Sequence, residues 1–377
     1  MTKRNHGEPK TRTMVSLFSG GGGLDLGLEA AGFQSRFSTD IDPFSCATLQ
    51  RGRSAATGLQ LPFMQESVVV NADINGLTSS FIFEASGLKR GEIDLLAGGP
   101  PCQAFSVFGK RLGRKDKRGQ LVEQYYRLLG ELRPKAFLFE NVFGLLTVER
   151  GRVFEEARKR LANPRPGLHY ELSVLRLEAA DYGVPQHRDR VFIVGSLEGL
   201  KVSSPNPVVH QNANIEEKNL PDLRTVKDGL RGLASPNEVH PKNHTGRLHS
   251  QRIVERYAKM QPRERDSHTR INKLDLATPS FTIIVGSDAG GGKGHIHPIE
   301  PREVTPRESA RLQTFPDWWE FVGEGRHAIR QVGNAVPPLL GYAVGAQILH
   351  DVFQIKPRSF EQALTMLAQN HLFPKGG

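Results

Sequence analysis

One cysteine stands where a side chain could act as a nucleophile. The chain has 377 residues but only two cysteines, Cys46 and Cys102. Cys102 follows the apolar run IDLLAGG and the stiff pair Pro100-Pro101, and a basic loop with spaced glycines comes next. A cysteine reacts as its thiolate in an accessible, electropositive setting, whereas a lone cysteine is more often a small buried core residue. The position of Cys102 alone leaves both interpretations open.

A run of glycines marks a candidate cofactor site. The sequence FSGGGGLDLGLEAAGF (18–33) follows a predicted strand and opens a predicted helix, so that backbone N–H groups can face a ligand. Asp40 ends the next predicted strand, about 20 residues on, where nucleotide-binding folds place an acidic side chain for ribose hydroxyls. A purely structural turn is the alternative, but the strand, helix and acid together predict a nucleoside-containing cofactor. There is no GxxxxGK[ST] motif, which disfavours a P-loop ATPase.

Alternating strand and helix patterns would position these residues. Strands are expected at 14–18, 33–41, 93–99, 136–142, 170–183 and 190–197. Helices are expected at 23–33, 43–51, 121–134, 338–353 and 359–372. This alternation predicts an α/β fold with a mostly parallel sheet covered by helices on both faces.

The pattern changes after Ser196, where prolines, Asn, His and scattered charges replace long periodic segments. We therefore expect a large domain of residues 1–196 and 327–377, and a smaller irregular domain of residues 197–326. No internal repeat and no low-complexity tract interrupts this organisation.

Composition narrows the class of partner. The formal net charge is +10 and the pI about 9.7. This excess of Lys and Arg favours polyanions such as nucleic acid, although a merely basic enzyme would have the same composition. There is no bilayer-spanning apolar run, no secretory signal and no disulfide or zinc pattern. His295 and His297 lack further ligands at matching spacing, so no metal is expected, and the chain is expected in the cytoplasm.

Six short blocks in fixed order carry a resemblance to a known family. They are FSGGGGLDLGLEAAG, GGPPCQAFS, ENV (140–142), YGVPQHRDRVFIVG (182–195), TPRESARLQTFPDWW (305–319) and GNAVPP (333–338). Together they resemble the DNA (cytosine-5) methyltransferases of bacterial restriction–modification systems, which use S-adenosyl-L-methionine. The resemblance implies a Rossmann-like methyltransferase domain and a smaller target-recognition domain. It covers most of the chain outside 197–300.

The resemblance implies a catalytic role for four residues. The thiolate of Cys102 would add to C6 of cytosine, so that C5 can attack a methyl sulfonium. Glu140 would serve N3 as the acid, which requires a raised pKa, and Arg190 would contact O2. Arg188 would help to hold the active-site loop or a phosphate, and Asn141 is expected to hold the turn. The alternatives are a strand-end salt bridge for Glu140 and a surface charge pair for the two arginines.

The resemblance also implies a cofactor site. Phe18, Gly20, Gly22, Gly23 and Leu24 would surround the methionine part of S-adenosylmethionine, with Pro100 nearby. Asp40 and Ile41 would meet ribose and adenine, Asp73 would accept from adenine N6 and Ile74 would pack on the ring; Asp73 could instead cap a turn. Asn334 would approach the methionine end. Ala335 stands where many relatives carry serine, so that a hydroxyl contact is lost there.

The basic loop after Cys102 resembles the mobile catalytic loop of the family. Its glycines would supply hinge freedom, and its charges would meet DNA phosphates while the target cytosine is flipped out of the helix. The residues expected to bind DNA are Lys110, Arg111, Lys115, Lys117 and Arg118. Segment 197–300 would read the DNA sequence, but no single base-reading residue stands out.

Three alternatives differ in substrate or in chemistry. A tRNA-methylating branch of the family is more compact, and the long 197–300 segment favours DNA. A non-catalytic DNA-binding relative tends to lose the cysteine or the glutamate, and both are present. A Rossmann-type dehydrogenase would not require Cys102, Glu140 and the arginine pair together. We expect a monomer on double-stranded DNA, with a cognate restriction endonuclease acting separately; an orphan or phage-borne enzyme is the alternative role.

Overall fold

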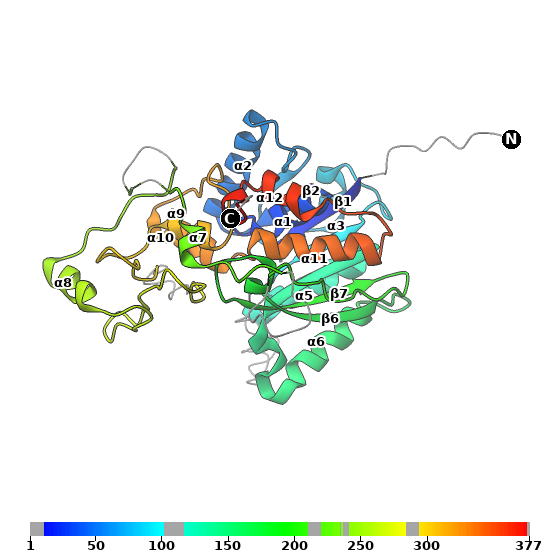
Figure 1. Ribbon diagram of the computed structural model, residues 1–377. Helices are drawn as coiled ribbons and strands as arrows, with labels where there is room; N and C mark the ends of the chain where they lie inside the picture. Colours follow the sequence, from blue (N-terminus) through cyan, green and yellow to red (C-terminus); the bar gives the residue numbers. More distant parts are fainter. Residues whose placement is uncertain are drawn as a thin grey trace.

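A mixed sheet forms the centre of the larger part of the molecule (Figure 1). The computed structural model describes residues 11–101, 117–209, 220–233, 235–236, 241–283 and 294–374. Within them, seven strands pair in the order β3-β2-β1-β4-β5-β7-β6. The strands are β1 (Arg12–Leu17), β2 (Phe33–Asp40), β3 (Val68–Asn71), β4 (Leu95–Gly98), β5 (Ala136–Val142), β6 (Glu171–Glu178) and β7 (Asp189–Ser196). Strands β1 to β5 are parallel, whereas β7 is antiparallel to β5 and β6, which confirms a mostly parallel sheet.

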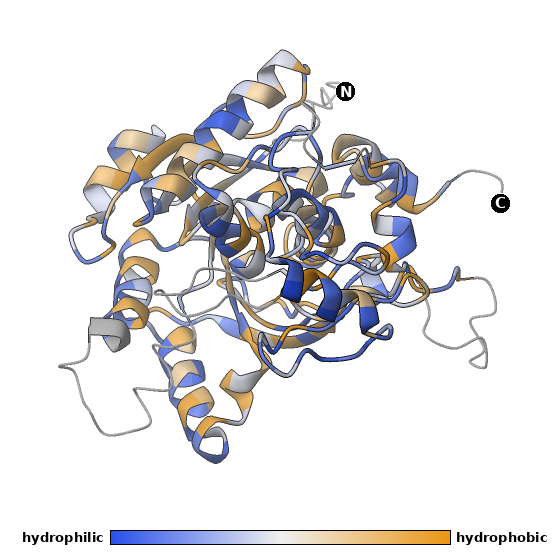
Figure 2. Cartoon of the chain, turned by 90° about the vertical axis from the view of Figure 1, so that its left-hand side faces the viewer, coloured by the Kyte–Doolittle hydropathy of each residue, from blue (hydrophilic) through white to orange (hydrophobic). Residues whose placement is uncertain are grey.

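Helices cover both faces of the sheet, as predicted. One face packs against α1 (Gly23–Ala31), α2 (Pro43–Gly58), α11 (Pro338–Asp351) and α12 (Phe360–Met366). The other face packs against α3 (Ser79–Ser86), α5 (Lys117–Leu132) and α6 (Arg152–Ala162). Since neighbouring strand residues point to opposite faces, Met14 belongs to the first core and Val15 to the second. Helices accordingly show hydrophobic and hydrophilic sides in Figure 2.

Several elements are absent from the sequence-based expectation. They are β3, α3, α6, α7 (Val226–Gly229), α8 (Gln251–Lys259), α9 (Pro306–Leu312) and α10 (Gly325–Asn334), and the short 3-10 turns Phe143–Leu146, Val148–Gly151, Ala179–Tyr182 and Asn370–Leu372. Strand β3 has four residues at the sheet edge, too few for a recognisable alternation. Helix α2 continues to Gly58 instead of ending at Arg51, because its last turns carry few apolar residues to mark them.

Glycines bring α1 and α11 into backbone contact. A Cβ on Gly27 would lie 2.4 Å from the carbonyl oxygen of Pro338 and 2.6 Å from the amide nitrogen of Tyr342. Gly341 faces α1 in return, because its Cβ would lie 3.3 Å from the Cα of Gly27. This contact sets the segment that precedes α11 beside the start of α1.

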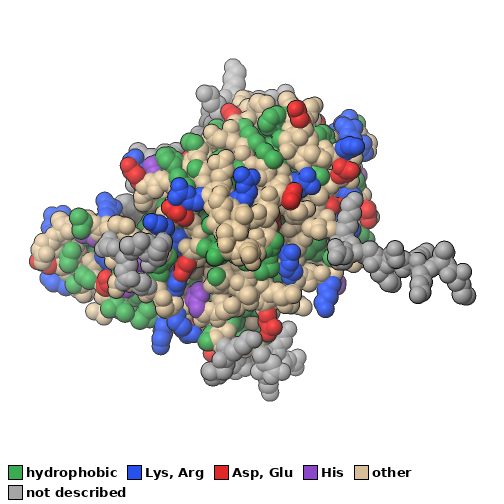
Figure 3. All heavy atoms as spheres, turned by 90° about the horizontal axis from the view of Figure 1, so that it is seen from above, with side chains coloured by type: hydrophobic (Ala, Val, Ile, Leu, Met, Phe, Trp, Pro, Cys, Tyr) green, Lys and Arg blue, Asp and Glu red, His purple; other side chains and the backbone are tan. Residues whose placement is uncertain are grey.

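A smaller part projects from the sheet and carries α8 (Figure 1). It contains two small apolar clusters, one around Leu274 and Val304 and one around Tyr257 and Ile296. Short helices α7 (Val226–Gly229) and α9 (Pro306–Leu312) border it. Lys and Arg side chains gather on this projection, at the left of Figure 3.

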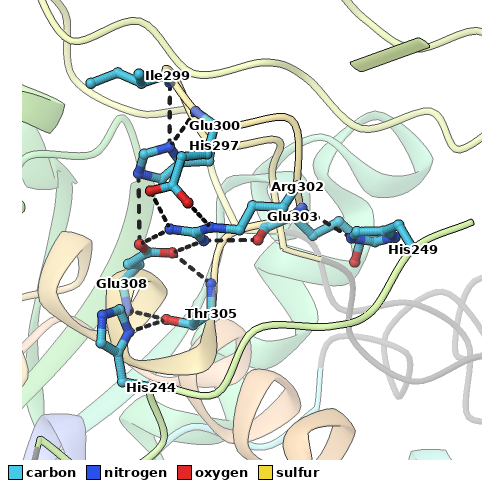
Figure 4. Close-up of polar contacts among 9 residues, drawn as sticks. All are labelled: His244, His249, His297, Ile299, Glu300, Arg302, Glu303, Thr305 and Glu308. Atoms are coloured by element: carbon cyan, nitrogen blue, oxygen red, sulfur yellow. Dashed lines mark hydrogen bonds and ion pairs between the residues drawn. The ribbon is translucent and has the colours of Figure 1, made fainter. Parts of the chain in front are cut away.

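An ionic network joins the projection to the start of α9 (Figure 4). Arg302 binds both oxygens of Glu308 at 2.8 Å and also pairs with Glu300. Glu308 accepts a hydrogen bond from the amide of Thr305 and forms a capping box with that residue. His297 accepts from the amide of Glu300 at 2.9 Å. Charge-assisted bonds of this kind fix the geometry of the segment that leads back to the large part.

From α9 onward, the chain enters the larger of the two cores that flank the sheet. Ala310, Phe315, Trp319 and Phe321 are all buried there beside residues of α1 and α2, although they fall inside the range 197–326 expected for the small domain. No helix within the described ranges is long and apolar enough to cross a bilayer.

We expect the stability of the protein to depend on the buried carboxyl group of Asp25, in the first turn of α1. Asp25 is 0% exposed, and burial raises its pKa from 3.8 to about 6. A raised acid pKa means that the folded state holds the proton more tightly, so this contribution to stability is present below pH 4 and is lost as the pH rises to about 6. At about 1.36 kcal/mol per pH unit, the window corresponds to roughly 3 kcal/mol.

The free energy of unfolding of Asp25→Asn, compared with that of the wild type at the same pH, should therefore increase between pH 4 and pH 6. Urea unfolding at several pH values measures this difference. Asp222→Asn, at an exposed position, is the control for loss of one carboxylate. A difference between Asp25→Asn and the wild type that does not change with pH would contradict the expectation.

Candidate active site

A cavity of about 940 Å³ opens at the carboxyl ends of β1, β2, β4 and β5. This edge is where ligand sites of parallel α/β sheets are found. Its described lining comes from 18–21, 23–24, 39–42, 45, 72–74, 99–101, 121, 140–142, 188, 190, 282–283, 330–331 and 333–336. The cavity thus draws on segments more than 300 residues apart in the chain.

The turn after β1 is held by a carboxylate from β2. The backbone of Phe18 and Gly20 has positive φ, at 56° and 51°, which bends the chain sharply between β1 and α1. Asp40 accepts a hydrogen bond from the amide of Gly20 at 2.8 Å and another from the amide of Asp42 at 2.9 Å. Burial raises the pKa of Asp40, and these two amide donors oppose that effect. Asp40 therefore shapes both loops of the cavity wall.

Two glycines of the same turn serve close packing. A Cβ on Gly23 would lie 2.1 Å from the carbonyl oxygen of Val336. Gly22 does not line the cavity, because its Cβ would point to Leu49 and Trp319 at 2.7 Å. The indole N–H of Trp319 also donates to the carbonyl of Gly21 at 2.9 Å, which anchors the turn from the far side.

Two apolar side chains and one acid also line the cavity. Ile41 is 64% exposed there, which is unusual for a large apolar side chain, whereas Ile74 is buried. Asp73 also lines the cavity, and its Oδ1 accepts from both the backbone and the side-chain amide of Asn75. Asp73 therefore caps this turn, which was the alternative considered for it. It also lines the cavity wall.

A buried acid and a buried base meet at the end of β5. The Oε1 atom of Glu140 lies 2.9 Å from Nε of Arg190, and both side chains are at most 13% exposed. Burial raises the pKa of Glu140, while the charges of Arg190 and Arg188 lower it. Because β7 is antiparallel to β5, its first residues lie beside the last residues of β5, and Arg190 pairs with Val142.

Arg188 faces inward and binds backbone oxygens. It is 1% exposed, and its guanidinium donates to the carbonyls of Gly333 at 2.6 Å and Ala335 at 2.9 Å. Burial lowers the pKa of Arg188. The alternative of a surface pair of Arg188 and Arg190 is wrong, because Arg190 is only 8% exposed. Arg188 instead ties the start of β7 to the segment before α11.

Asn141 holds the turn after β4, as expected. Its side-chain amide donates to the carbonyl of Pro100 at 3.0 Å. This bond connects the end of β5 to the Pro-Pro segment that precedes Cys102.

Most of the residues expected at the site lie together. The cavity is lined by Phe18, Gly20, Gly23, Leu24, Asp40, Ile41, Asp73, Ile74, Pro100, Glu140, Arg188, Arg190, Asn334 and Ala335. Cys102, Lys110, Arg111 and Lys115 lie outside the described residues, and Lys117 and Arg118 belong to the first turn of α5. The roles of all these residues stay predictions.

Sequence reasoning missed several lining residues. Thr282 comes from the projecting part, and its hydroxyl donates to the carbonyl of His187 at 2.7 Å. Arg330 and Gln331 lie just before GNAVPP, and Leu121 lies in α5. In the sequence, only the position of Arg330 next to the GNAVPP block could have indicated that it lines the cavity.

The two histidines weighed as metal ligands have other contacts. His295 Nε2 lies 3.1 Å from the carbonyl of Phe281, and His297 Nε2 lies 3.6 Å from Glu308. Over the described ranges, no group of three or more His, Cys, Asp or Glu side chains could hold a metal ion.

Comparisons with known proteins agree on one family. Residues 12–350 match the family model described as C-5 cytosine-specific DNA methylase. The chain is 34% identical over 369 residues to the Type II methyltransferase M.XorII of Xanthomonas oryzae pv. oryzae, covering 89% of this chain and 84% of that protein. It is 33% identical over 359 residues to the Type II methyltransferase M.Eco47II of Escherichia coli, covering 92% of this chain and 81% of that protein.

Solved structures show the same fold. A prophage-encoded E. coli protein assigned as a DNA modification methyltransferase superimposes with a TM-score of 0.71 and 28% identity, over 91% of this chain and all of that chain. The Dnmt2 methyltransferase of S. pombe gives a TM-score of 0.61 at 19% identity, over 89% of this chain and 98% of that chain. The second likeness concerns the fold alone.

The tight contact at Gly23 leads to a prediction about stability. Gly23→Ala should lower the free energy of unfolding by about 2 kcal/mol or more, because the methyl group would meet the Val336 carbonyl and the ring of Phe315. Urea unfolding measures the loss. Gly58→Ala is the matched control, since a Cβ there meets nothing within 4 Å, and it should be neutral or slightly stabilising. Equal effects of the two changes would contradict the prediction.

Proposed function

This chain belongs to the C-5 cytosine-specific DNA methylase family, and from that membership we infer that it modifies one cytosine within a short, specific sequence of double-stranded DNA. It is a DNA (cytosine-5) methyltransferase, with S-adenosyl-L-methionine as the methyl donor. The named relatives are Type II methyltransferases, so we propose the role of modification enzyme in a restriction–modification system. The observation that carries the proposal is the buried Glu140–Arg190 pair in the wall of the same cavity as the glycine turn.

The residues of the cavity fit the cofactor. Ile41 offers an exposed apolar face that an adenine ring would cover, and Asp40 retains carboxylate lone pairs for ribose hydroxyls beyond its two amide bonds. The turn at Phe18 and Gly20 and the backbone before α11 would enclose the methionine part. The cofactor supplies an electrophilic methyl group on sulfur.

We assign the nucleophile to Cys102, one residue beyond the described Pro101. Its thiolate would form a bond to C6 of the flipped-out cytosine, which makes C5 electron-rich enough to accept the methyl group. Loss of the proton from C5 and departure of the thiolate from C6 would then restore the aromatic ring. Asn141, bonded to the carbonyl of Pro100, would help to aim the segment that carries the thiol.

We assign the acid to Glu140. Negative charge moves toward N3 and O2 of the ring as the thiolate adds, so a proton donor at N3 lowers the barrier. Burial raises the pKa of Glu140, which keeps its carboxyl protonated to higher pH than an exposed glutamic acid. Arg190 opposes that effect by its charge and would donate to O2 from the same wall.

We propose a structural role for Arg188, instead of the contact with the active-site loop or a phosphate that the resemblance implied. Both of its observed bonds go to backbone carbonyls of 333–335, so we propose that it positions the methionine end of the cofactor site relative to the cytosine pocket.

DNA would lie across the cavity, between the large part and the projection. The net charge of +10 favours binding of a polyanion, and Lys and Arg side chains gather on the projection in Figure 3. We propose that the loop carrying Lys110, Arg111 and Lys115 closes over the flipped cytosine and that the projection reads bases. A monomer acting in the cytoplasm beside a separate nuclease completes the proposal.

Sequencing of converted DNA tests this function. The protein is incubated with S-adenosylmethionine and DNA of mixed sequence, with a tRNA pool in parallel, and bisulfite treatment then reveals protected cytosines. Protection at one position of one short DNA motif is the expected result. Protection confined to tRNA would contradict the DNA substrate, and no protection anywhere would contradict the catalytic role.

Replacement of the proposed nucleophile gives a second prediction. Cys102→Ala should lose methyl transfer by several orders of magnitude, because no bond to C6 can form, yet it should still bind S-adenosylhomocysteine. Tritium transfer and calorimetry measure the two properties. Cys46→Ala is the matched control: Cys46 is buried, does not line the cavity and should leave transfer within about threefold. Transfer by Cys102→Ala at a rate close to the wild type would exclude the covalent route.

A further inference from the structure

Three cationic side chains line the described part of the cavity, and two of them have close partners. Arg190 pairs with Glu140 at 2.9 Å, and Arg188 donates to two backbone carbonyls at 2.6 and 2.9 Å. Both are buried, and their observed partners occupy them. The third cation, Arg330, has no part in the roles assigned so far.

Arg330 retains most of its capacity to donate. Within the described residues, the polar contact of its side chain is a long one, 3.5 Å from Nη2 of Arg330 to Oδ2 of Asp42. That carboxylate is already occupied, because Asp42 caps α2 by accepting from the amide of Phe44 and from the hydroxyl of Ser45, both at 3.2 Å. The Arg330 side chain is 33% exposed, and the residue lines the cavity. A guanidinium has five N–H donors, and the observed contact uses one of them.

Arg330 lies about one helical turn before Asn334 in α10, and Asn334 is the residue proposed at the methionine end of the cofactor site. Arg330 precedes Asn334 by four residues, so the two share one face of the helix. Both line the cavity together with Gln331 and Ala335. Ala335 has no side-chain hydroxyl to offer a ligand.

The amino-acid end of the cofactor carries a carboxylate that needs a partner when it leaves water. A guanidinium suits it, because its planar fork can donate two parallel hydrogen bonds to one carboxylate. We propose that Arg330 binds the carboxylate of the methionine part of S-adenosylmethionine and determines specificity for a nucleoside that carries an amino-acid tail. The inference rests on the cofactor placement of the proposed function. Asp42 orients the guanidinium before the ligand arrives.

A pair of ligands that differ only in the amino-acid tail tests this role. S-adenosylhomocysteine carries the carboxylate, whereas 5′-methylthioadenosine has the same nucleoside and thioether without it. Titration calorimetry on the full chain gives both dissociation constants for the wild type, Arg330→Ala and Arg330→Lys. Arg326→Ala, in the same helix and exposed, is the matched control.

The proposal predicts that Arg330→Ala weakens only the binding of the ligand that carries the carboxylate. Arg330→Ala should bind S-adenosylhomocysteine about tenfold more weakly than the wild type, since a charge-assisted contact is lost, and should bind 5′-methylthioadenosine unchanged. Arg330→Lys should recover part of the affinity, because it keeps the charge and loses the fork. Arg326→Ala should leave both constants unchanged.

Other outcomes would overturn the proposal in distinguishable ways. Equal weakening for the two ligands would show that Arg330 only supports the fold of α10. Unchanged affinity for both, together with weaker binding of a DNA duplex, would assign Arg330 to a phosphate of DNA. A wild-type protein that binds neither ligand would overturn the cofactor placement of the proposed function itself.

Discussion

The site depends on the backbone contact between α1 and α11. Gly27 and Gly341 leave no side chain between these helices, so the carbonyl of Pro338 approaches the position of the missing Gly27 Cβ to 2.4 Å. Any Cβ at Gly27 would push α11 outward and carry with it the segment 333–336 that borders the cavity. Packing of this density transmits displacement instead of absorbing it. The two walls of the candidate cofactor site are therefore held at one separation by two residues that touch no ligand.

Buried charge links the two halves of the site. Glu140, Arg190 and Arg188 form a line from the end of β5 to the turn before α11. Each of these groups would be costly to bury alone, and each finds a charge or a carbonyl within hydrogen-bonding distance. The reversed direction of β7 makes the arrangement possible, because it brings the first residues of a strand to the edge where the other strands end.

Local patterns were sufficient to predict six of the seven described strands, and the family resemblance supplied most of the residues expected at the cavity wall. The turn after β1 and the acid at the end of β2 are short local motifs whose structural role can be inferred from the sequence. Asp40 lies where its spacing from the glycine turn predicted. The inward direction of Arg188 was not predictable, because its partners are carbonyls 145 and 147 residues away and leave no mark in the local sequence. The same applies to Trp319, whose indole contacts Gly21 across 298 residues. Contacts to backbone atoms across such distances depend on the finished fold.

The order in which the cavity wall occurs along the chain has a consequence for biosynthesis. A ribosome releases the turn at Phe18 and Gly20 early, and it releases Asn334 to Val336, which close the same cavity, more than 300 residues later. A nascent chain that stops before α10 has the strands but lacks the wall opposite Gly23 and the partners of Arg188. Pairing of such remote segments is a late and slow event in folding. The cavity is therefore complete only after the last tenth of the family domain, which contains residues 333–336, has been synthesised. Truncated translation products that lack this part are expected to be unable to methylate DNA.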